Sequence, residues 1–273
     1  MRILALVFTI AFGAASLFAQ DNEAKEEKIY TPESGDISIG IDGTPVFNYI
    51  GNMFNGNMGN AFNPGDTKFY FRYFLTDNSA ARIVLGINNG TLIDHFYIDD
   101  DAALLLDPNS NAQLEDVMKV KTRDMEIRLG YQQFRGYKRL LGFYGADIGY
   151  RYQKIHRSFQ YGNEMNELNP APTTQWGNQA VRPLEINNGA INTIFAGVFT
   201  GAEYYLLPKI CVGMELGLTY GVDFEKQSWT KQERMVLTQH VEEEVATDPG
   251  SRWRNTNTQF PYTYGNFYFA VHF

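Results

Sequence analysis

The stretch TQFPYTYGNFYFAVHF, Thr258 to Phe273, decides the fold class. Phe267, Phe269, Val271 and Phe273 stand at alternate positions, so a strand places all four side chains on one face. A strand that closes a barrel in lipid turns such a face to hydrocarbon and leaves no edge unpaired. The ending on an outward phenylalanine therefore predicts that the chain crosses a membrane with strands.

This final strand resembles that of bacterial outer-membrane proteins, which ends in Phe after apolar residues at alternate positions. In that family the folding machinery recognises the last strand. The resemblance implies that Phe267, Phe269, Val271 and Phe273 act as the assembly signal. It also implies that the outer-membrane assembly machinery is a partner of this chain.

The amino end of the chain predicts export. Met1 to Ala19 contains Arg2, an apolar run from Ile3 to Phe12 and then small residues, which is typical of a secretory signal peptide cleaved after Ala19. The charged run DNEAKEEK follows and predicts a mobile periplasmic tail. No other stretch is apolar for the ~18 residues that a spanning helix needs. The predicted organisation is a signal peptide over 1–19, a tail over 20–35 and one barrel domain over 36–273.

The composition agrees with strands in lipid. The 273 residues include 17 Tyr and 20 Phe, and a mean hydropathy of −0.32 is too polar for a helical membrane protein. The net charge of −8 argues against nucleic acid as a partner. The single cysteine, Cys211, excludes an intramolecular disulfide, and we expect it in the lumen as a small residue. Nothing in the sequence calls for a cofactor.

Alternating apolar residues predict eight strands joined by short turns and long loops. The predicted strands cover 36–48, 68–75, 81–96, 117–134, 139–159, 189–206, 210–224 and 258–273. The long loops cover 51–66, 97–116, 160–188 and 225–257. In transmembrane barrels, short turns face the periplasm and long loops face the outside. The fold class is therefore predicted to be all-β: a transmembrane, antiparallel, up-and-down β-barrel of eight strands.

Aromatic clusters at strand ends separate this prediction from its alternative. The clusters Tyr204–Tyr205, Tyr150–Tyr152 and Phe69–Tyr73 are predicted to form girdles at the two membrane interfaces. The alternative is a soluble β-sandwich or lipocalin-like barrel, whose apolar faces would point inward. The terminal Phe, the difference in loop length and the aromatic clusters all favour the membrane barrel.

Two segments carry a wider resemblance. YFLTDNSAARIVLGI (Tyr73 to Ile87) and GAEYYLLPKICVGMELGLTYG (Gly201 to Gly221) look like parts of the outer-membrane β-barrel proteins common in Bacteroidota. With eight predicted strands, the chain resembles the small outer-membrane barrels of the OmpA transmembrane domain and OmpX type. The resemblance implies a location in the outer membrane, with contact to lipid and lipopolysaccharide. It implies a fold and a location rather than an activity.

The faces opposite the apolar ones predict a charged lumen. An eight-stranded barrel is just wide enough for its own side chains to fill it. The inward positions carry five basic and five acidic residues: Lys68, Arg72, Arg82, Arg128, Arg151, Asp124, Glu126, Asp147, Glu203 and Glu215. Buried charges need partners, so we expect a network of ion pairs that plugs the barrel. On strand 210–224, Met214 is expected to face lipid and Glu215 the lumen. A small-solute pore is the alternative and requires this network to rearrange.

A lipid A deacylase-like hydrolase is an alternative from another class. His156 and Ser158, in HRSF, fall on one face of a strand, and Glu164 follows. This arrangement resembles the His-x-Ser pair of outer-membrane lipid A deacylases, in which His is the base and Ser the nucleophile. The family pattern continues with Asn, where this chain has Phe159, and that departure puts the activity in doubt. We therefore expect no enzyme and interpret the pair as polar residues at the headgroup boundary.

The loops are predicted to carry the function. The acidic runs 99–101 and 242–244 lack the ligand spacing of a calcium loop, so we expect solvated charge and no metal site. Trp229 and Trp253, in the longest predicted loop, are candidates for protein contact. The predicted function is a structural or partner-binding role through extracellular loops. The protein would act as a subunit or accessory of a larger envelope assembly.

Overall fold

The computed structural model describes residues 30–43, 45–46, 49, 67–178, 180–254 and 263–273. The predicted signal peptide, the first part of the predicted tail and the predicted loop 51–66 lie outside these residues. Most described residues belong to antiparallel strands, and a short helix, α3 (Asp101–Leu106), lies between two of the long ones. No described helix is long and apolar enough to cross a membrane.

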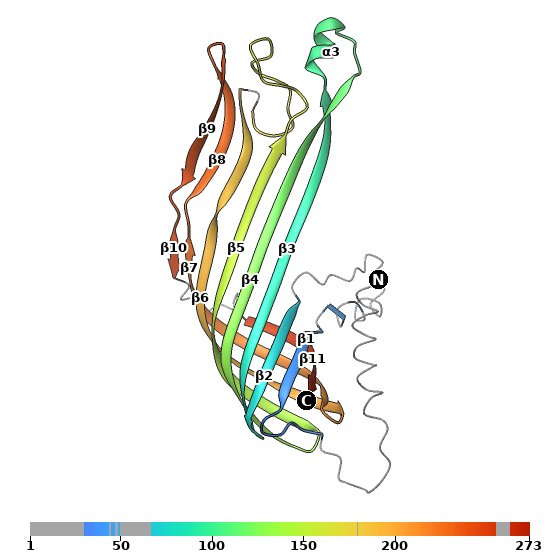
Figure 1. The fold of residues 1–273 in the computed structure, drawn as a ribbon, viewed down its shortest axis with the longest axis vertical. Helices are drawn as coiled ribbons and strands as arrows, with labels where there is room; N and C mark the ends of the chain where they lie inside the picture. Colours follow the sequence, from blue (N-terminus) through green and yellow to red (C-terminus); the bar gives the residue numbers. More distant parts are fainter. Residues whose placement is uncertain (1–29, 44, 47–48, 50–66, 179, 255–262) are drawn as a thin grey trace.

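Eight antiparallel strands close into a ring, as the sequence predicts (Figure 1). They are β1 (Ile37–Asp42), β2 (Lys68–Thr76), β3 (Ser79–Asp99), β4 (Gln113–Tyr137), β5 (Leu140–Gln160), β6 (Val181–Leu207), β7 (Ile210–Glu225) and β11 (Thr263–His272). β11 pairs with both β7 and β1, which closes the ring. At this seam Phe273 and Ile37 exchange two backbone hydrogen bonds of 3.0 and 2.8 Å. Closure gives each of these eight strands a partner on both sides.

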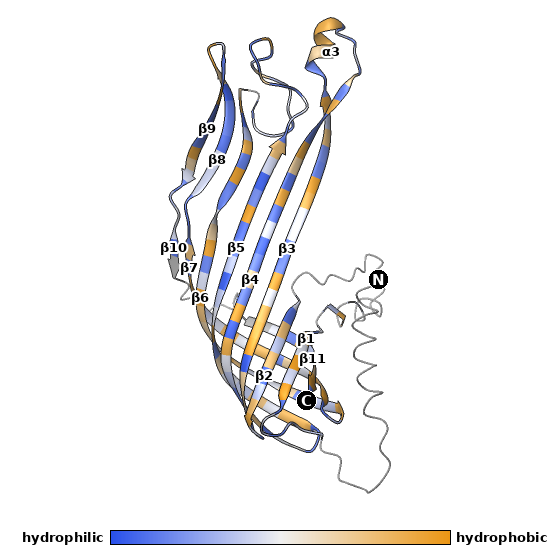
Figure 2. Ribbon diagram, in the orientation of Figure 1, coloured by the Kyte–Doolittle hydropathy of each residue, from blue (hydrophilic) through white to orange (hydrophobic). Residues whose placement is uncertain are grey.

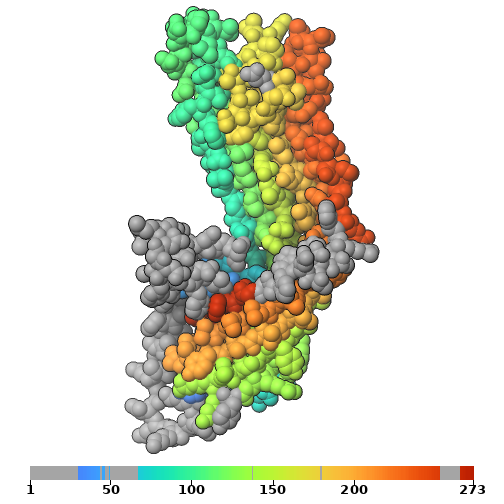
Figure 3. Space-filling view, turned by 180° about the vertical axis from the view of Figure 1, so that it is seen from behind, coloured from blue at the N-terminus to red at the C-terminus, as the bar shows by residue number. Residues whose placement is uncertain are grey.

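The wall of the ring is uneven in height. β1, β2 and β11 have 6, 9 and 10 residues, whereas β4 and β6 have 25 and 27. Since about 9–11 tilted residues span a bilayer, the long strands continue well beyond the ring. They form an open curved sheet, which we call the wing: residues 89–99, 113–123, 154–160 and 181–190, with β8 (Ser228–Val236) and β9 (Gln239–Asp248). Figure 3 shows the wing rising above the lower wall formed by β7 and β11.

The prediction that residues 225–257 form a loop was wrong. β8 and β9 form a hairpin that pairs with the extension of β6, and β10 (Arg252–Arg254) pairs with the end of β7. Trp229 and Trp253 therefore lie on strands. The hairpin is polar on both faces, so it lacks the apolar alternation that signals a strand. Cross-strand ion pairs hold it instead, such as Lys231 with Glu242 at 2.6 Å.

Three tight turns join the strands at the other end of the ring, which we call the turn end. They fall at Asp77–Asn78, Lys138–Arg139 and Pro208–Lys209. Lys209 has a φ of 61°, and a proline before a residue of positive φ suits a type II turn. These short connections place consecutive strands side by side, which fixes the up-and-down order of the ring.

The residues before β1 cross the turn end as a strap, Tyr30–Asp36. The hydroxyl of Tyr30 accepts a hydrogen bond from Arg139 at 2.6 Å, and its carbonyl accepts one from the Lys209 N–H at 3.1 Å. At the far side, Ser34 donates to Asp77 at 2.8 Å. The strap is therefore tied to three different turns, whereas the sequence suggested a mobile tail up to residue 35.

Alternation along each strand separates the two faces of the ring, and Figure 2 shows the resulting mixture of apolar and polar residues on the long strands. On β4, Met125, Ile127 and Leu129 are exposed, while the residues between them are at most partly exposed. Tyr204 faces outward, as predicted for a girdle residue. Its neighbour Tyr205 is fully buried inside, so that part of the girdle prediction was wrong because adjacent residues of a strand face opposite ways.

Candidate functional site

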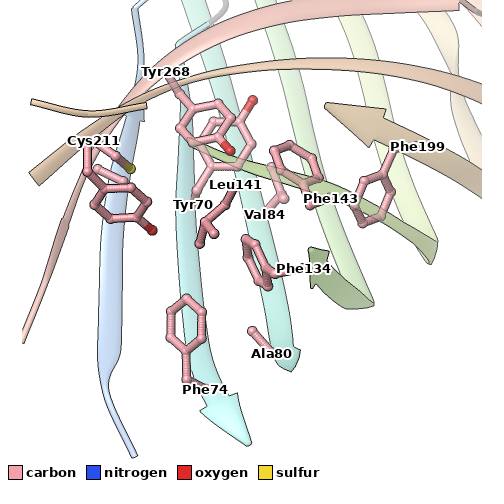
Figure 4. Packing of buried hydrophobic residues seen from close by; sticks show 12 residues of the cluster. Tyr70, Phe74, Ala80, Val84, Phe134, Leu141, Phe143, Phe199, Cys211 and Tyr268 are labelled. Carbon is pink, nitrogen blue, oxygen red and sulfur yellow. The ribbon is translucent and has the colours of Figure 1, made fainter. Parts of the chain in front are cut away.

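The turn end of the lumen is filled by aromatic and aliphatic side chains (Figure 4). Phe74 and Phe134 pack with ring centroids 5.4 Å apart, and Phe134 and Phe143 lie 5.9 Å apart. Tyr70 stacks on Tyr268 at 5.0 Å. These aromatic side chains come from β2, β4, β5 and β11, so packing inside the barrel ties the wall together and leaves a solid floor.

The first ion pair above this floor joins Arg72 and Glu203, both buried. The hydroxyls of Tyr205 and Tyr268 donate to the same carboxylate at 2.9 and 2.6 Å. Arg72 also lies 5.5 Å from the ring of Tyr268. Glu203 therefore has a cation and two hydroxyl donors, which is the kind of environment that a buried carboxylate requires.

The next level is centred on Arg82. Its guanidinium contacts Glu215 at 2.5 and 3.0 Å and Asp147 at 3.3 Å. The same group lies 3.7 Å above the ring of Phe199, a cation–π contact. One arginine thus links strands β3, β5 and β7 across the barrel axis. Glu215 and Asp147 thus share one guanidinium, and Arg128 also acts electrostatically on Asp147.

Towards the wing the charges become less buried. Glu126 pairs with Arg128 at 2.6 Å and with Lys68 at 3.3 Å. Above them, Asp124 pairs with Arg151, and Gln153 donates to Asp124 at 3.0 Å. The Arg151 side chain is 41% exposed, whereas that of Arg82 is 3% exposed. The polar network therefore runs from the dry floor to the wetter mouth of the ring.

The structure brings all ten residues of the predicted lumen network into the barrel and into ion pairs. They are Lys68, Arg72, Arg82, Asp124, Glu126, Arg128, Asp147, Arg151, Glu203 and Glu215. Several pairs join strands that are not neighbours in sequence. The strap crosses the turn end, the aromatic floor lies inside it, and the ten charged residues follow at successive levels of the lumen.

Sequence reasoning missed a cluster of metal-ligand types beside the first ion pair. Ligand atoms of Glu203, Cys211 and His272 all lie within 4.8 Å of one another, and all three residues are buried. The Cys211 sulfur is 3.6 Å from Nε2 of His272. The cluster was not visible in the sequence because its members come from β6, β7 and β11. Since Glu203 is already bound by Arg72 and two tyrosines, we interpret the cluster as the polar rim of the floor.

The outer face of the ring carries the opposite chemistry. Exposed apolar and aromatic side chains surround it, and we call this set the apolar belt: Ile37, Ile39, Phe69, Tyr73, Ile83, Ile87, Met125, Ile127, Leu129, Tyr131, Tyr144, Ile148, Tyr150, Ile194, Val198, Tyr204, Met214, Leu216, Leu218, Tyr220, Phe267, Phe269 and Phe273. Met214 is 43% exposed and Glu215 is 1% exposed, in agreement with the predicted register. Apolar side chains outside and paired charges inside are the pattern of a barrel solvated by lipid. The fold is that of a transmembrane β-barrel.

Comparisons with known proteins give distant likenesses. No family model and no curated protein matches the chain. It is similar to a major outer membrane protein from Thermus thermophilus, at 10% identity and a TM-score of 0.40, over 88% of this chain and 100% of that one. It is also similar to the outer membrane protein OprG from Pseudomonas aeruginosa, at 10% identity and a TM-score of 0.35, over 90% of this chain and 99% of that one. Likenesses this distant assign neither a family nor a function.

The residues of the hydrolase alternative do not form a triad among the described residues. His156 lies 3.7 Å from Glu185 of β6 and makes an edge contact with Trp229. No hydrogen bond joins Ser158 to His156 in the described part of the chain. Glu164 lies in the loop between β5 and β6 and is exposed. The acidic partner of His156 is therefore a residue of the neighbouring strand and not the predicted one.

The far end of the wing is capped by a folded loop. We call α3 together with residues 161–178 the crown. Asp116, fully buried on β4, accepts hydrogen bonds from the N–H groups of Gly162 and Gln175, both at 2.9 Å. Trp176 of the crown packs on Phe96 and Phe159 of the wing at 5.4 and 5.6 Å. The long connection between β5 and β6 is thus fastened to the sheet below it.

The acidic run 99–101 was predicted to be solvated charge, and the structure gives two of its members a structural role. The Asp100 side chain caps α3 by accepting from Ala102 and Ala103. Asp101 accepts from Asn169 and from the Thr173 N–H at 2.7 and 2.8 Å. Burial raises the pKa of Asp101, but these hydrogen bonds outweigh it and hold the pKa below its usual value of 3.8. The carboxylates therefore hold the crown together.

Proposed function

We propose that this protein is an integral outer-membrane protein that acts through its wing and crown rather than through its lumen. In the orientation that we propose, the turn end and the strap face the periplasm, and the wing faces the outside of the cell. The function is a structural or partner-binding one, without catalysis, in the cell envelope. The protein serves as a subunit or accessory of a larger assembly.

One observation carries this proposal: the two ends of the molecule are built differently. The ring is filled by aromatic side chains and ion pairs, so its interior is occupied at the levels of Arg72 and Arg82. Above the ring, four long strands continue as an ordered sheet, and a folded crown is fastened to it. An anchor needs only the ring. Ordered structure beyond the membrane is the part that can meet a partner.

Exposed leucines at the tips of the wing support a role in contact. Leu106 at the end of α3, Leu168 of the crown and Leu237 at the β8–β9 turn are 91%, 89% and 94% exposed. Figure 1 places these three segments at the same end of the molecule, far from the ring. Each of the three tips therefore offers an apolar side chain that a partner can cover.

The first test asks whether the ring is a closed anchor. The full chain is refolded into lipid vesicles and examined for heat-modifiable migration on a gel and for conductance in planar bilayers. We expect a compact band without boiling and no steady conductance. A steady, voltage-stable conductance would instead support the small-solute pore. Failure to migrate differently after boiling would contradict membrane insertion itself.

The second test locates the working surface. A photo-crosslinking residue replaces Leu237 at the wing tip in one variant and Lys138 at the turn end in the other, in cells that express the full chain. We expect a discrete adduct with an envelope component from position 237 on the outer surface. Position 138 is the matched control and should give adducts only with periplasmic components. Equal adduct patterns at both positions would overturn the proposed orientation.

A further inference from the structure

We infer that the outward face of β4 and β5, directly above the apolar belt, binds the phosphate groups of a lipid headgroup in the outer leaflet. Five basic residues form this surface, which we call the basic patch: Lys119, Lys121, Arg123, Lys154 and His156. The inference rests on the proposed insertion in the outer membrane, and it names a ligand site on the wing.

Alternation along the strands fixes the direction in which the patch faces. On β4, Lys121 and Arg123 are exposed and continue the series of Met125 and Ile127, while Thr122 between them is half-buried. The first cations therefore leave the sheet on the face that meets lipid. Arg123 lies only two residues, about 7 Å along the strand, beyond Met125, the last apolar side chain of this series. Headgroup phosphates lie at this height above the hydrocarbon.

The register of the two strands sets two cations opposite each other. Arg123 lies directly opposite Lys154, and in the next outward pair Lys121 lies opposite His156, which is charged only when protonated. Opposite residues of an antiparallel pair have Cβ atoms roughly 4.5–5.5 Å apart, and like charges at this distance destabilise the sheet. A phosphate that binds between the two side chains attracts both cations, and this attraction outweighs the repulsion between them. The arrangement is therefore unfavourable by itself and favourable with an anion.

The patch lacks carboxylates of its own. Among the described residues, Lys119, Lys121, Arg123 and Lys154 form no side-chain ion pair, although the chain has 31 acidic and only 23 basic residues. His156 alone has an acidic neighbour, Glu185 at 3.7 Å. On the β3 side, the residues opposite Arg123 and Lys121 are the uncharged Asn89 and Thr91. Cations left unpaired in an acidic protein point to an anion that comes from outside.

The chemistry of the patch favours phosphate. Arginine presents a planar fork of donors that matches phosphate oxygens, and lysine adds compact positive charge beside it. Basic side chains next to a membrane surface each contribute about 1 kcal/mol to the binding of anionic lipid. A phosphorylated glycolipid of the outer leaflet, such as lipopolysaccharide, presents its phosphates at the height of Arg123 and Lys154. We therefore assign the patch to that headgroup.

The binding test uses native mass spectrometry of the full chain in neutral detergent. Diphosphorylated lipid A, or the same lipid without its phosphates, is titrated into the native chain, into K121Q/R123Q/K154Q and into the control R135Q/K138Q/K226Q. The control makes the same change in net charge at exposed positions away from the patch. The native chain and the control should bind phosphorylated lipid alike. The patch variant should bind it on the order of a hundredfold more weakly at low salt, at ~1 kcal/mol for each cation.

Three outcomes of this test would overturn the inference. Equal binding of the native chain and the patch variant would show that the patch is not the site. Displacement of the lipid by inorganic phosphate at comparable concentration would show a site for free phosphate rather than for a headgroup. Loss of binding in the control as well would show that net charge, and not the patch, attracts the lipid.

A stability measurement separates failure of this inference from failure of the proposed function. In vesicles of neutral lipid, the patch variant should unfold at the same or higher urea concentration than the native chain, because like charges have been removed. In vesicles that contain phosphorylated lipid A, the order should reverse. Equal midpoints in both vesicle types would overturn the inference alone. A native chain that fails to insert into either vesicle would overturn the proposed function.

Discussion

The ring and the wing share four strands, but charged residues of β4 that face inward in the ring also appear on the outer face in the wing. On β4, Glu126 and Arg128 point into the ring and pair with each other. A few residues further along the same strand, Lys121 and Arg123 point outward on the wing. The period of two is unchanged, so the difference lies in the surroundings of the outer face. Lipid excludes charge from that face of the ring, whereas water and headgroups accept it on the wing.

The two regions also differ in how they are held together. Each ring strand has a neighbour on both sides, and the lumen is packed, so the ring should unfold as one unit. The wing has open edges, and its crown depends on a few hydrogen bonds such as those to Asp116. Local opening of the crown should therefore need much less free energy than opening of the ring.

The largest effect is expected where a ring charge loses its partner. Glu203→Leu leaves Arg72 buried without its carboxylate and should lower the free energy of unfolding by about 3–5 kcal/mol. The measurement is the urea midpoint in lipid vesicles. The double variant R72L/E203L also deprives Tyr205 and Tyr268 of their acceptor, so its difference from the single variant isolates the buried charge. We expect the double variant to recover most of the loss. A double variant as unstable as the single one would contradict the pairing in the lumen.

The same substitution on the two regions gives the next largest contrast. Met214→Arg places a cation in the apolar belt and should cost about 2–4 kcal/mol near the middle of the bilayer. Leu237→Arg, at the exposed hairpin tip, should change stability by no more than ~0.5 kcal/mol. Both variants are measured by urea unfolding in the same vesicles. Similar costs at the two positions would show that the belt does not face lipid.

A third prediction concerns the attachment of the crown. Asp116→Asn replaces one carboxylate oxygen by an amide NH₂ group. Both oxygens accept hydrogen bonds in the native chain, so the new donor faces another donor, an N–H group or the Thr174 hydroxyl. The lost hydrogen bonds should weaken the local structure by about 1–3 kcal/mol. Hydrogen exchange of the Gly162 and Gln175 amides should accelerate, while the urea midpoint of the ring stays the same. A matching fall in the ring midpoint would show that wing and ring unfold together.

The smallest effect is expected from acid. The pKa of Asp101 lies below its usual value of 3.8, so its hydrogen bonds stabilise the crown above that pH. This stabilisation is lost as the pH falls through the lowered pKa of the folded state. Exchange of the Thr173 amide should therefore rise below about pH 3.8, and Asp101→Asn should remove that pH dependence. A pH dependence that survives in the variant would assign it to another carboxylate.

Much of the ring could be predicted because one physical rule governs it. Lipid on one face and a narrow lumen on the other force a strict alternation, so the directions of Met214 and Glu215 follow from their neighbours. The same rule selects the ten inward charges. It does not give their partners. Arg82 meets Glu215 and Asp147 only because closure of the ring brings β3, β5 and β7 around one axis.

The wing could not be predicted in the same way. The β8–β9 hairpin has polar residues on both faces, so its strands carry no apolar alternation and resemble a loop. The strap is equally inconspicuous in sequence, since its contacts are a few hydrogen bonds to distant turns. The cluster of Glu203, Cys211 and His272 is built from three strands and has no motif. These features depend on long-range pairing.

The sequence by itself determined which residues of the ring face out and which face in, because alternation is a local property of a strand between two solvents. It also determined the order of strands at the turn end, because very short connections leave adjacent strands no other arrangement. Only the tertiary structure decided which charges pair across the lumen, how far the wing extends and where the basic patch lies. Those features depend on the register of β4 and β5, which sets Arg123 opposite Lys154 and Glu126 opposite Arg151, and on the curvature of the closed ring. Register and closure are set by all eight strands together.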